Sequence, residues 1–213
     1  MKPAVLCIER EALQQQGIPY NTSGIFHFNI NNVNPENFHF LNRKLVDNKD
    51  NKVYQDIAYL LPQILPYIAI TDGKGKYLSY SRNGTETRLH DSRSIGIGGH
   101  VDIYDSYDTY NEEDTYWQSI EATILSACRR ELEEEISLTC DGDWLVSKTN
   151  LSKLIIDTTN PVGEVHVGLF STLVYPNAQP QEELYDAKWL TVDELKASID
   201  EYENWSKLII EGL

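Results

Sequence analysis

Four glutamates lie within five residues of this chain, at Glu131 and at Glu133 to Glu135. The apolar spacing around them predicts an amphipathic helix over roughly 115–136, with the acids in its last turns. The C-terminal end of a helix carries partial negative charge, and like charges three or four residues apart repel each other. A bound cation would offset that cost, so the glutamates are candidate metal ligands.

The four glutamates point in different directions around the predicted helix. At about 100° per residue, the apolar stripe that starts at Ile120 continues through Glu131, with Glu134 and Glu135 close on either side, whereas Glu133 points away. Crowded, partly buried carboxylates raise one another's pKa unless a metal ion neutralises them. Oxygen ligands of this kind favour Mg²⁺ or Mn²⁺ over zinc. The alternative is a solvated acidic helix end without a metal.

This segment resembles the signature sequence of the Nudix hydrolases, in which a glycine-rich turn precedes a helix. The helical part of the signature is Arg-Glu-apolar-any-Glu-Glu-any-Gly-apolar. The residues that match at this spacing are Arg130, Glu131, Leu132, Glu134, Glu135 and Leu138. The upstream stretch 94–101, with the sequence SIGIGGHV, resembles the glycine-rich turn.

The chain departs from the signature at three points. Ser137 replaces the glycine that usually ends the helix, and Ala122 replaces an earlier glutamate, with Glu121 one place off. The spacer between Gly99 and Arg130 is also longer than in the signature. Ser137 can still end a helix, although without the easy positive φ of glycine. We expect the insertion to loop out and to leave the arrangement of turn and helix intact.

The resemblance implies Mg²⁺- or Mn²⁺-dependent hydrolysis of a diphosphate bond in a nucleoside diphosphate-linked or related small molecule. Glu134 and Glu135 correspond to the main metal ligands, and Glu131 to a glutamate that binds metal or helps to activate water. A backbone carbonyl at Gly98 or Gly99, most simply Gly99, corresponds to a further metal ligand. The metal would neutralise phosphate charge and lower the pKa of the attacking water.

Two further roles in hydrolysis fall to residues around these ligands. Arg130 corresponds to an arginine that pairs with a carboxylate of the signature, and we group it with Glu131 as catalytic. Some members of the family take their general base from outside the signature. The candidates here are Glu164, Glu182 and Glu183, which the sequence does not rank and which can equally be plain surface acids.

Cations that could bind the phosphates lie just before and within the glycine-rich turn. Arg82, Arg88 and Arg93 gather there in an otherwise acidic chain. His90 and His100 could donate hydrogen bonds, and His100 is also a candidate to support the turn. We therefore predict Arg82, Arg88, Arg93 and His100 as substrate-binding residues, with ordinary surface arginines as the alternative.

Strand and helix patterns alternate along the chain and predict an α/β fold, a Nudix-type α/β/α sandwich with a mixed β-sheet. We divide the chain into an N-terminal extension, 1–60, and a Nudix-like hydrolase domain, 61–213. The extension could cover the core, shape the pocket or mediate a homodimer. The expected strands are 4–8, 67–71, 77–81, 154–158 and 164–175, and the expected helices are 9–16, 35–45, 115–136, one opened by the capping box at 191–194, and a final amphipathic helix.

The inserted stretch 102–117 alternates tyrosines with acids. We expect a long surface loop there. The functional alternatives are a lid over the site and an aromatic wall that stacks a nucleotide base.

Charge and cysteine content limit the possible partners and location. The net charge of −15 disfavours binding to duplex DNA or an anionic membrane, because both require a cationic surface. Cys7, Cys128 and Cys140 are widely spaced and odd in number, which suggests a reduced, cytoplasmic setting. We expect no signal peptide and no membrane span, and a small nucleotide-derived diphosphate as the ligand.

Three other functions stay open at this point. A non-catalytic, nucleotide-sensing Nudix-fold domain is one, although such domains often lose the signature glutamates that this chain keeps. An isoprenoid diphosphate isomerase is another, and it would need an acid/base pair across an apolar pocket, which the sequence does not identify. An acidic module that binds a basic protein is the third, and it leaves the inward phase of the glutamates unexplained.

Overall fold

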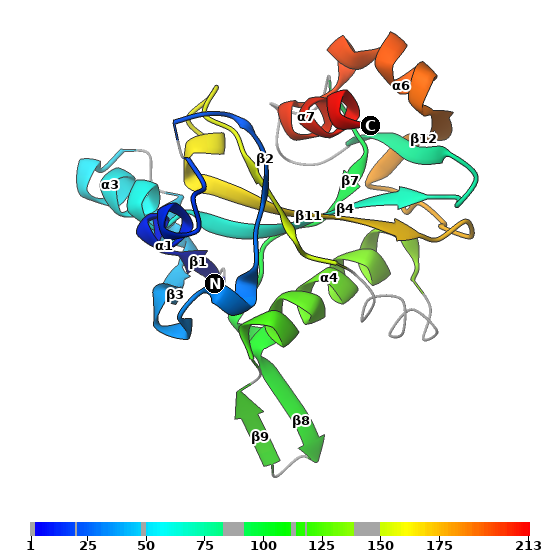
Figure 1. The fold of residues 1–213 in the computed structure, drawn as a ribbon. Coiled ribbons are helices and arrows are strands. Elements are labelled where there is room, and N and C mark those ends of the chain that lie inside the picture. Colours follow the sequence, from blue (N-terminus) through cyan, green and yellow to red (C-terminus); the bar gives the residue numbers. More distant parts are fainter. Residues whose placement is uncertain are drawn as a thin grey trace. The chain divides into compact units, whose positions relative to one another are not determined.

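The computed structural model describes residues 3–19, 21–47, 50–82, 92–111, 114–117, 119–138 and 150–213. The chain has an α/β fold whose residues group into two compact units, each made of three segments (Figure 1). Strands β4 (Gln63–Thr71) and β11 (His166–Val174) and helix α4 (Ile120–Ile136) each pass from one unit to the other. Unit 1 comprises Met1–Pro66, Gly99–Ala127 and Leu151–Leu169, and unit 2 comprises Tyr67–Gly98, Cys128–Asn150 and Phe170–Leu213.

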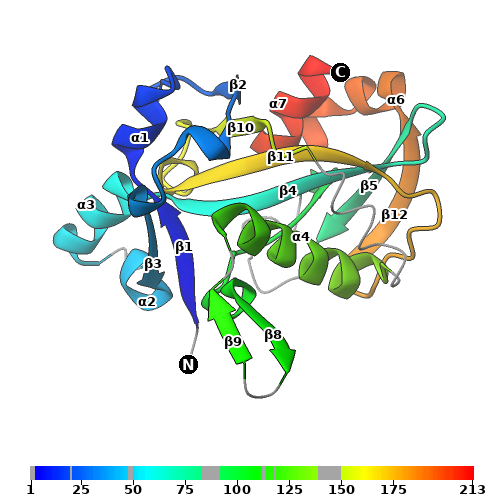
Figure 2. The same ribbon diagram turned by 60° about the horizontal axis from the view of Figure 1, so that its bottom comes forward.

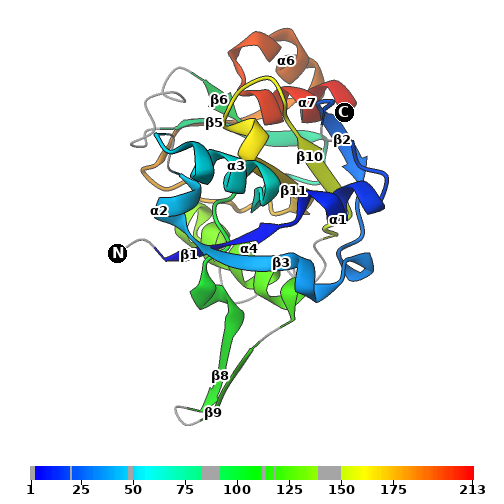
Figure 3. The ribbon, with the colours of Figure 1, turned by 90° about the vertical axis from the view of Figure 1, so that its left-hand side faces the viewer.

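Unit 1 is built around strand β1 (Ala4–Ile8), which confirms the first predicted strand. It pairs antiparallel with β3 (Phe38–Asn42) along its whole length and meets β4 at Cys7 and Gln63 (Figure 3). The other strands of the unit are β2 (Gly24–His27) and β10 (Lys153–Ile156), which pair antiparallel, with β10 next to β11. The buried side chains of β1 form part of the core of the unit.

The helices of unit 1 are short. Helix α1 (Arg10–Gln15) ends before Gly17, whose φ of 75° confirms the predicted stop. The predicted helix over 35–45 is wrong, because its middle forms β3, and only its two ends have short helical turns. Alternating aromatic residues suit a strand, and β1 offers them a pairing edge. The remaining helical segments are α2 (Arg43–Val46), α3 (Lys52–Leu60) and the 3₁₀ turns η1 (Ile30–Asn32), η2 (Pro35–Asn37), η3 (Ile103–Ser106) and η4 (Gly163–Val165).

The inserted stretch forms a β-hairpin rather than the long surface loop that we expected. Strands β8 (Tyr107–Asn111) and β9 (Asp114–Trp117) pair antiparallel from Tyr107 and Trp117 outward, and they project away from the other strands of unit 1 (Figure 1). The many tyrosines and threonines here favour extended backbone. Helix α4 consequently begins at Ile120 rather than at 115. The lid and the aromatic wall depend on side chains that lie outside the described residues.

In unit 2, strand β5 (Lys76–Arg82) lies between β12 (Leu184–Thr191) and β4 (Figure 2). The predicted hairpin between β4 and β5 is confirmed, and the backbone N–H of Asp72 donates to the carbonyl of Lys76 at 3.0 Å. Two short strands extend these ladders. They are β6 (Arg93–Ser94), which pairs with β5, and β7 (Gly96–Ile97), which pairs with β4.

The C-terminal helices complete unit 2. Helix α6 (Val192–Ala197) opens with the predicted capping box, in which Thr191 and Glu194 bind each other's backbone N–H groups. The 3₁₀ turn η5 (Ile199–Glu201) leads to helix α7 (Asn204–Gly212), which confirms the predicted final helix. Among the helices of the described residues, none has the length and apolarity needed to cross a membrane.

A buried tyrosine ties α7 to the strands of unit 2. The Tyr67 hydroxyl contacts the hydroxyls of Ser94 at 2.9 Å and Ser206 at 2.7 Å, and it also donates to Glu203. Burial, followed by the neighbouring Glu203, raises the pKa of Tyr67 well above its usual value, so the phenol stays protonated. Gly96 lies against the ring, where a Cβ atom would come within 1.9 Å of it.

Candidate hydrolytic site

Helix α4 presents the signature glutamates around a buried apolar edge. Leu132 and Ile136 are fully buried, Glu131 and Glu135 are half-buried, and Glu133 is exposed, as its phase predicts. Glu134 is exposed, whereas the phase argument placed it beside the buried stripe. The buried stripe of this helix end follows Leu132 and Ile136, which turns Glu134 toward solvent.

Arginines neutralise part of this acidic helix end. The guanidinium of Arg130 contacts Glu131, with Nη1 and Oε1 2.6 Å apart, and the Glu131 side chain is only 13% exposed. On the outer side of the helix, Arg129 pairs with Glu133 one turn later at 2.8 Å. The structure therefore gives Glu131 and Glu133 different surroundings, one partly enclosed and one open to solvent.

The end of α4 has the geometry of a glycine-terminated helix, although it carries a serine. Ser137 has a φ of 52°, in the left-handed region that glycine normally occupies. The N–H of Leu138 donates to the carbonyl of Leu132 at 3.2 Å, and this backbone hydrogen bond closes the helix end. The substitution of glycine by Ser137 thus leaves the form of the helix end intact.

A loop segment, Gln179–Gln181, binds this helix end, and we call it the clamp segment. The backbone N–H of Gln179 donates to the carbonyl of Ile136 at 3.1 Å, and that of Gln181 donates to the carbonyl of Glu135 at 2.9 Å. The Gln181 side chain donates from Nε2 to Ser137 Oγ at 2.6 Å. These bonds occupy carbonyls that a helix end leaves without an intrahelical donor. No pattern in the sequence predicted this contact.

The clamp segment distinguishes the candidate general bases. Glu182 and Glu183 are exposed and directly follow Gln181, so their backbone lies next to the end of α4. Glu164 lies in η4 of unit 1, where its carbonyl accepts from the guanidinium of Arg10. The structure thus brings Glu182 and Glu183, but not Glu164, into the unit that holds the signature glutamates.

The glycine-rich turn follows β7 as Gly98, Gly99 and His100. The ring of His100 packs edge-on against that of His166, with their centroids 5.9 Å apart. Nδ1 of His166 lies 2.7 Å from the carbonyl of Val162, which fixes the orientation of this second ring. Both histidines thus lie in a ring pair within unit 1, and the substrate-binding role predicted for His100 stays a prediction.

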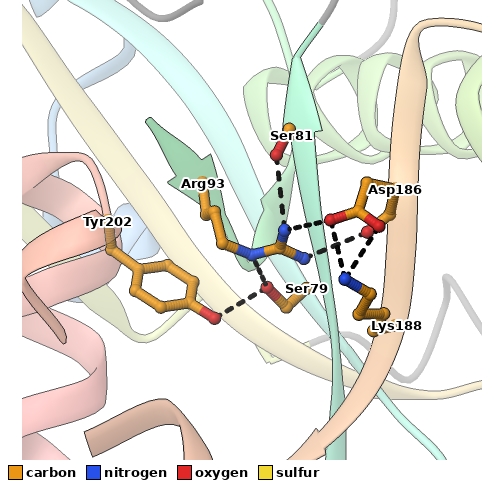
Figure 4. Close-up of polar contacts among 6 residues, drawn as sticks. All are labelled: Ser79, Ser81, Arg93, Asp186, Lys188 and Tyr202. Carbon is orange, nitrogen blue, oxygen red and sulfur yellow. Dashed lines mark hydrogen bonds and ion pairs between the residues drawn. The ribbon is translucent and has the colours of Figure 1, made fainter. Parts of the chain in front are cut away.

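Arg93 is the predicted phosphate-binding arginine whose side chain the structure describes, and it lies in a polar network between β5 and β12 (Figure 4). It donates from Nε to Ser79 Oγ at 2.9 Å and from Nη1 to the carboxylate of Asp186 at 2.8 Å. Its side chain is 12% exposed. The side chain of Arg82 and all of Arg88 and His90 lie outside the described residues.

Asp186 is a residue that sequence reasoning missed. It has a φ of 50° at a bulge in β12, and its carboxylate lies between the cations of Lys188 and Arg93. The hydrogen bond from Lys188, and then that from Arg93, hold the pKa of Asp186 below its usual value. This arrangement commits the charge of Arg93 to a partner within the protein (Figure 4).

The carboxylates at the end of α4 are the type of ligand that a hard divalent cation prefers. Glu131, Glu134 and Glu135 stand three and four residues apart, which places them on neighbouring positions of the helix surface. Oε2 of Glu135 is buried from solvent, as suits a ligand atom at the base of a site. Among the described residues, no group of three or more His, Cys, Asp or Glu side chains is gathered closely enough to hold a metal ion. The fit therefore rests on ligand type and helical spacing.

Comparison with known protein sequences identifies the family of this chain. It is 31% identical over 159 residues to protein YmaB of Bacillus subtilis (strain 168), an alignment that covers 71% of this chain and 70% of that protein. The chain belongs to the YmaB family. No family model matches the sequence.

Solved structures identify the fold of this YmaB-family protein. Tm1382, provisionally named a Nudix hydrolase, superimposes with a TM-score of 0.65 and 20% identity over 98% of this chain and 97% of its own. A bifunctional NMN adenylyltransferase/ADP-ribose pyrophosphatase of Francisella tularensis, solved with AMP and a manganese ion, gives a TM-score of 0.50 at 17% identity. That alignment covers 80% of this chain and half of the bifunctional protein. The chain thus has the Nudix fold, as its signature-like segment predicted.

Proposed function

We propose that this YmaB-family protein hydrolyses a diphosphate bond in a small, nucleotide-derived molecule with the help of Mg²⁺ or Mn²⁺. The observation that carries the proposal is the position of Glu131, Glu134 and Glu135 on neighbouring surface positions of α4 within a Nudix fold. An acidic helix end of this kind is unfavourable without a cation, and a diphosphate substrate needs its charge neutralised.

The signature glutamates have different roles in the proposed hydrolysis. Glu134 and Glu135 would hold the metal. The bound metal supplies charge neutralisation and a lowered pKa for water. Glu131, held by Arg130 at 2.6 Å and largely enclosed, orients or deprotonates the attacking water.

Of the outside candidates for the general base, we favour Glu182. It directly follows the residue whose N–H binds the Glu135 carbonyl, so its backbone is fixed next to the glutamate helix. Glu183 comes second, since it lies one residue farther along the chain. Replacement of Glu182 by Gln should then lower kcat more than it raises KM.

For the substrate class we start from a protein of the same fold. The Francisella protein of the same fold is named as an ADP-ribose pyrophosphatase and was solved with AMP and manganese. We therefore place nucleoside diphosphate-linked molecules first among the substrates to test. We assign phosphate binding to Arg82, Arg88 and His100 ahead of Arg93, because Asp186 already accepts two hydrogen bonds from Arg93.

We further propose a cytoplasmic protein, in line with the free thiols of Cys7 and Cys128. The described residues include no disulfide between these two buried cysteines. A homodimer through residues 1–60 stays a proposal that gel filtration with light scattering would test.

The decisive experiment measures release of phosphate or nucleoside monophosphate from nucleotides, ADP-ribose, NADH and dinucleoside polyphosphates, with Mg²⁺, Mn²⁺ or EDTA. The test variant is Glu134→Gln, and the matched control is Glu133→Gln, its exposed neighbour that pairs with Arg129. Turnover that needs metal, is lost in Glu134→Gln and survives in Glu133→Gln would support the proposal. Tight nucleotide binding without turnover of any compound would favour the nucleotide sensor instead.

A further inference from the structure

The contact between the clamp segment and α4 joins parts of the chain that are distant in sequence. The clamp segment lies on the loop between β11 and β12, and it binds the last turn of the helix that carries the glutamates. Gln181 makes the largest share of the bonds. Its N–H reaches the Glu135 carbonyl, and its Nε2 reaches both Ser137 Oγ at 2.6 Å and the carbonyl of Gln179 at 2.8 Å.

The need for such a contact follows from Ser137. A residue with a Cβ is strained at a φ of 52°, whereas glycine adopts this angle freely. A strained helix end stays in place only when its surroundings hold it there. The Gln181 side chain bonds directly to the strained residue, and the backbone of the clamp segment binds the two preceding carbonyls.

We propose that Gln181 is a positioning residue for the metal-binding glutamates. By holding Ser137 in its left-handed conformation, it fixes the last turn of α4 and therefore the direction of the Glu134 and Glu135 side chains. This inference rests on the proposed function, because it assumes that these glutamates bind a metal. The Gln181 side chain would thus stabilise a backbone conformation that a glycine at position 137 would adopt without help.

The test is the affinity of the full-length protein for Mn²⁺, measured from the electron paramagnetic resonance signal of free Mn²⁺ in a titration. Gln181→Met keeps the size of the side chain and its backbone N–H but removes both side-chain hydrogen bonds. Gln179→Met is the matched control, since Gln179 is equally exposed and binds the helix through its backbone N–H. Thermal unfolding of each variant shows whether the fold is retained.

We expect Gln181→Met to weaken Mn²⁺ binding by about tenfold, the lower end of the losses seen when residues that orient metal ligands are removed. Gln179→Met should bind as the wild type does. Ser137→Gly introduced into Gln181→Met should restore the affinity, because glycine holds the required φ without help. A role of Gln181 in general stability alone would not give this rescue of metal binding.

The outcomes separate this inference from the proposed function. If the wild type fails to bind Mn²⁺, or if Glu135→Gln binds it equally well, the metal site and the inference that rests on it both fail. If Glu135→Gln loses affinity while Gln181→Met keeps it, the metal site stands and the positioning role is refuted. Loss in Gln181→Met without rescue by Ser137→Gly would also overturn the role proposed for Ser137 and Gln181.

Discussion

Replacement of Gly96 by Ala should strongly destabilise unit 2. A Cβ atom at this position would lie 1.9, 2.2 and 2.3 Å from three atoms of the Tyr67 ring, whereas ordinary contacts begin at 3.4 Å. The ring would therefore have to move by about 1.5 Å in a closely packed core. It has little freedom to do so, because its hydroxyl is bound to Ser94, Ser206 and Glu203. The ring also forms a T-shaped pair with that of Trp205, with centroids 5.4 Å apart.

The cost can be worked from these contacts. Overpacking of a core costs about 1–3 kcal/mol, and a buried hydroxyl that loses its partner adds about 1–3 kcal/mol. Together they predict a loss of about 2–6 kcal/mol in the free energy of unfolding for Gly96→Ala. For a chain of this size, each kcal/mol lowers Tm by about 2–4 °C, so a decrease on the order of 10 °C is expected.

The assay is thermal and urea-induced unfolding followed by circular dichroism. Gly212→Ala is the control, because its added Cβ meets no atom within 4 Å, and it should change stability by less than about 1 kcal/mol. In the double variant with Tyr67→Leu, the cost of Gly96→Ala should shrink, since the obstructing ring is gone. A Gly96→Ala protein within about 1 kcal/mol of the wild type would refute the packing argument.

Three further predictions concern pH, catalysis and local stability. Burial raises the pKa of the Cys7 thiol to about 12. The stability contributed by the neutral thiol is therefore complete below pH 9 and is lost as the pH rises toward 12. The urea midpoints at pH 8 and pH 10.5 should differ less in Cys7→Ala than in the wild type. If Glu134 binds the catalytic metal, Glu134→Gln should reduce kcat/KM by at least about 100-fold, whereas Glu133→Gln should stay near the wild type. Equal effects of the two variants in steady-state assays would contradict the role of Glu134 as a metal ligand. Thr191→Ala removes the capping box of α6 and should cost about 1 kcal/mol in urea unfolding, while an unchanged midpoint would show that the cap does not contribute.

Local sequence patterns predicted the structure correctly wherever neighbouring residues decide it. The turn from Asp72 to Lys76, the capping box at Thr191, the stop at Gly17 and the outward position of Glu133 all depend on residues within one or two turns of each other. The Nudix fold was predicted from the resemblance of residues 130–138 and of the glycine-rich turn to the signature of that family. The local features follow from backbone geometry and helical periodicity.

The features that the sequence did not predict depend on contacts between segments that are distant in the chain. Residues 38–42 form a strand because β1 lies beside them, and Glu134 is exposed because the buried edge of α4 follows Leu132 and Ile136. Arg93 lies in a network with Asp186, a residue far away in sequence, and Gln181 holds the end of the glutamate helix. Helical periodicity predicted the glutamates as candidate metal ligands and placed them on one helix. The partners that hold this helix in place became known from the fold, because hydrogen bonds between remote segments leave no periodic signal in the chain.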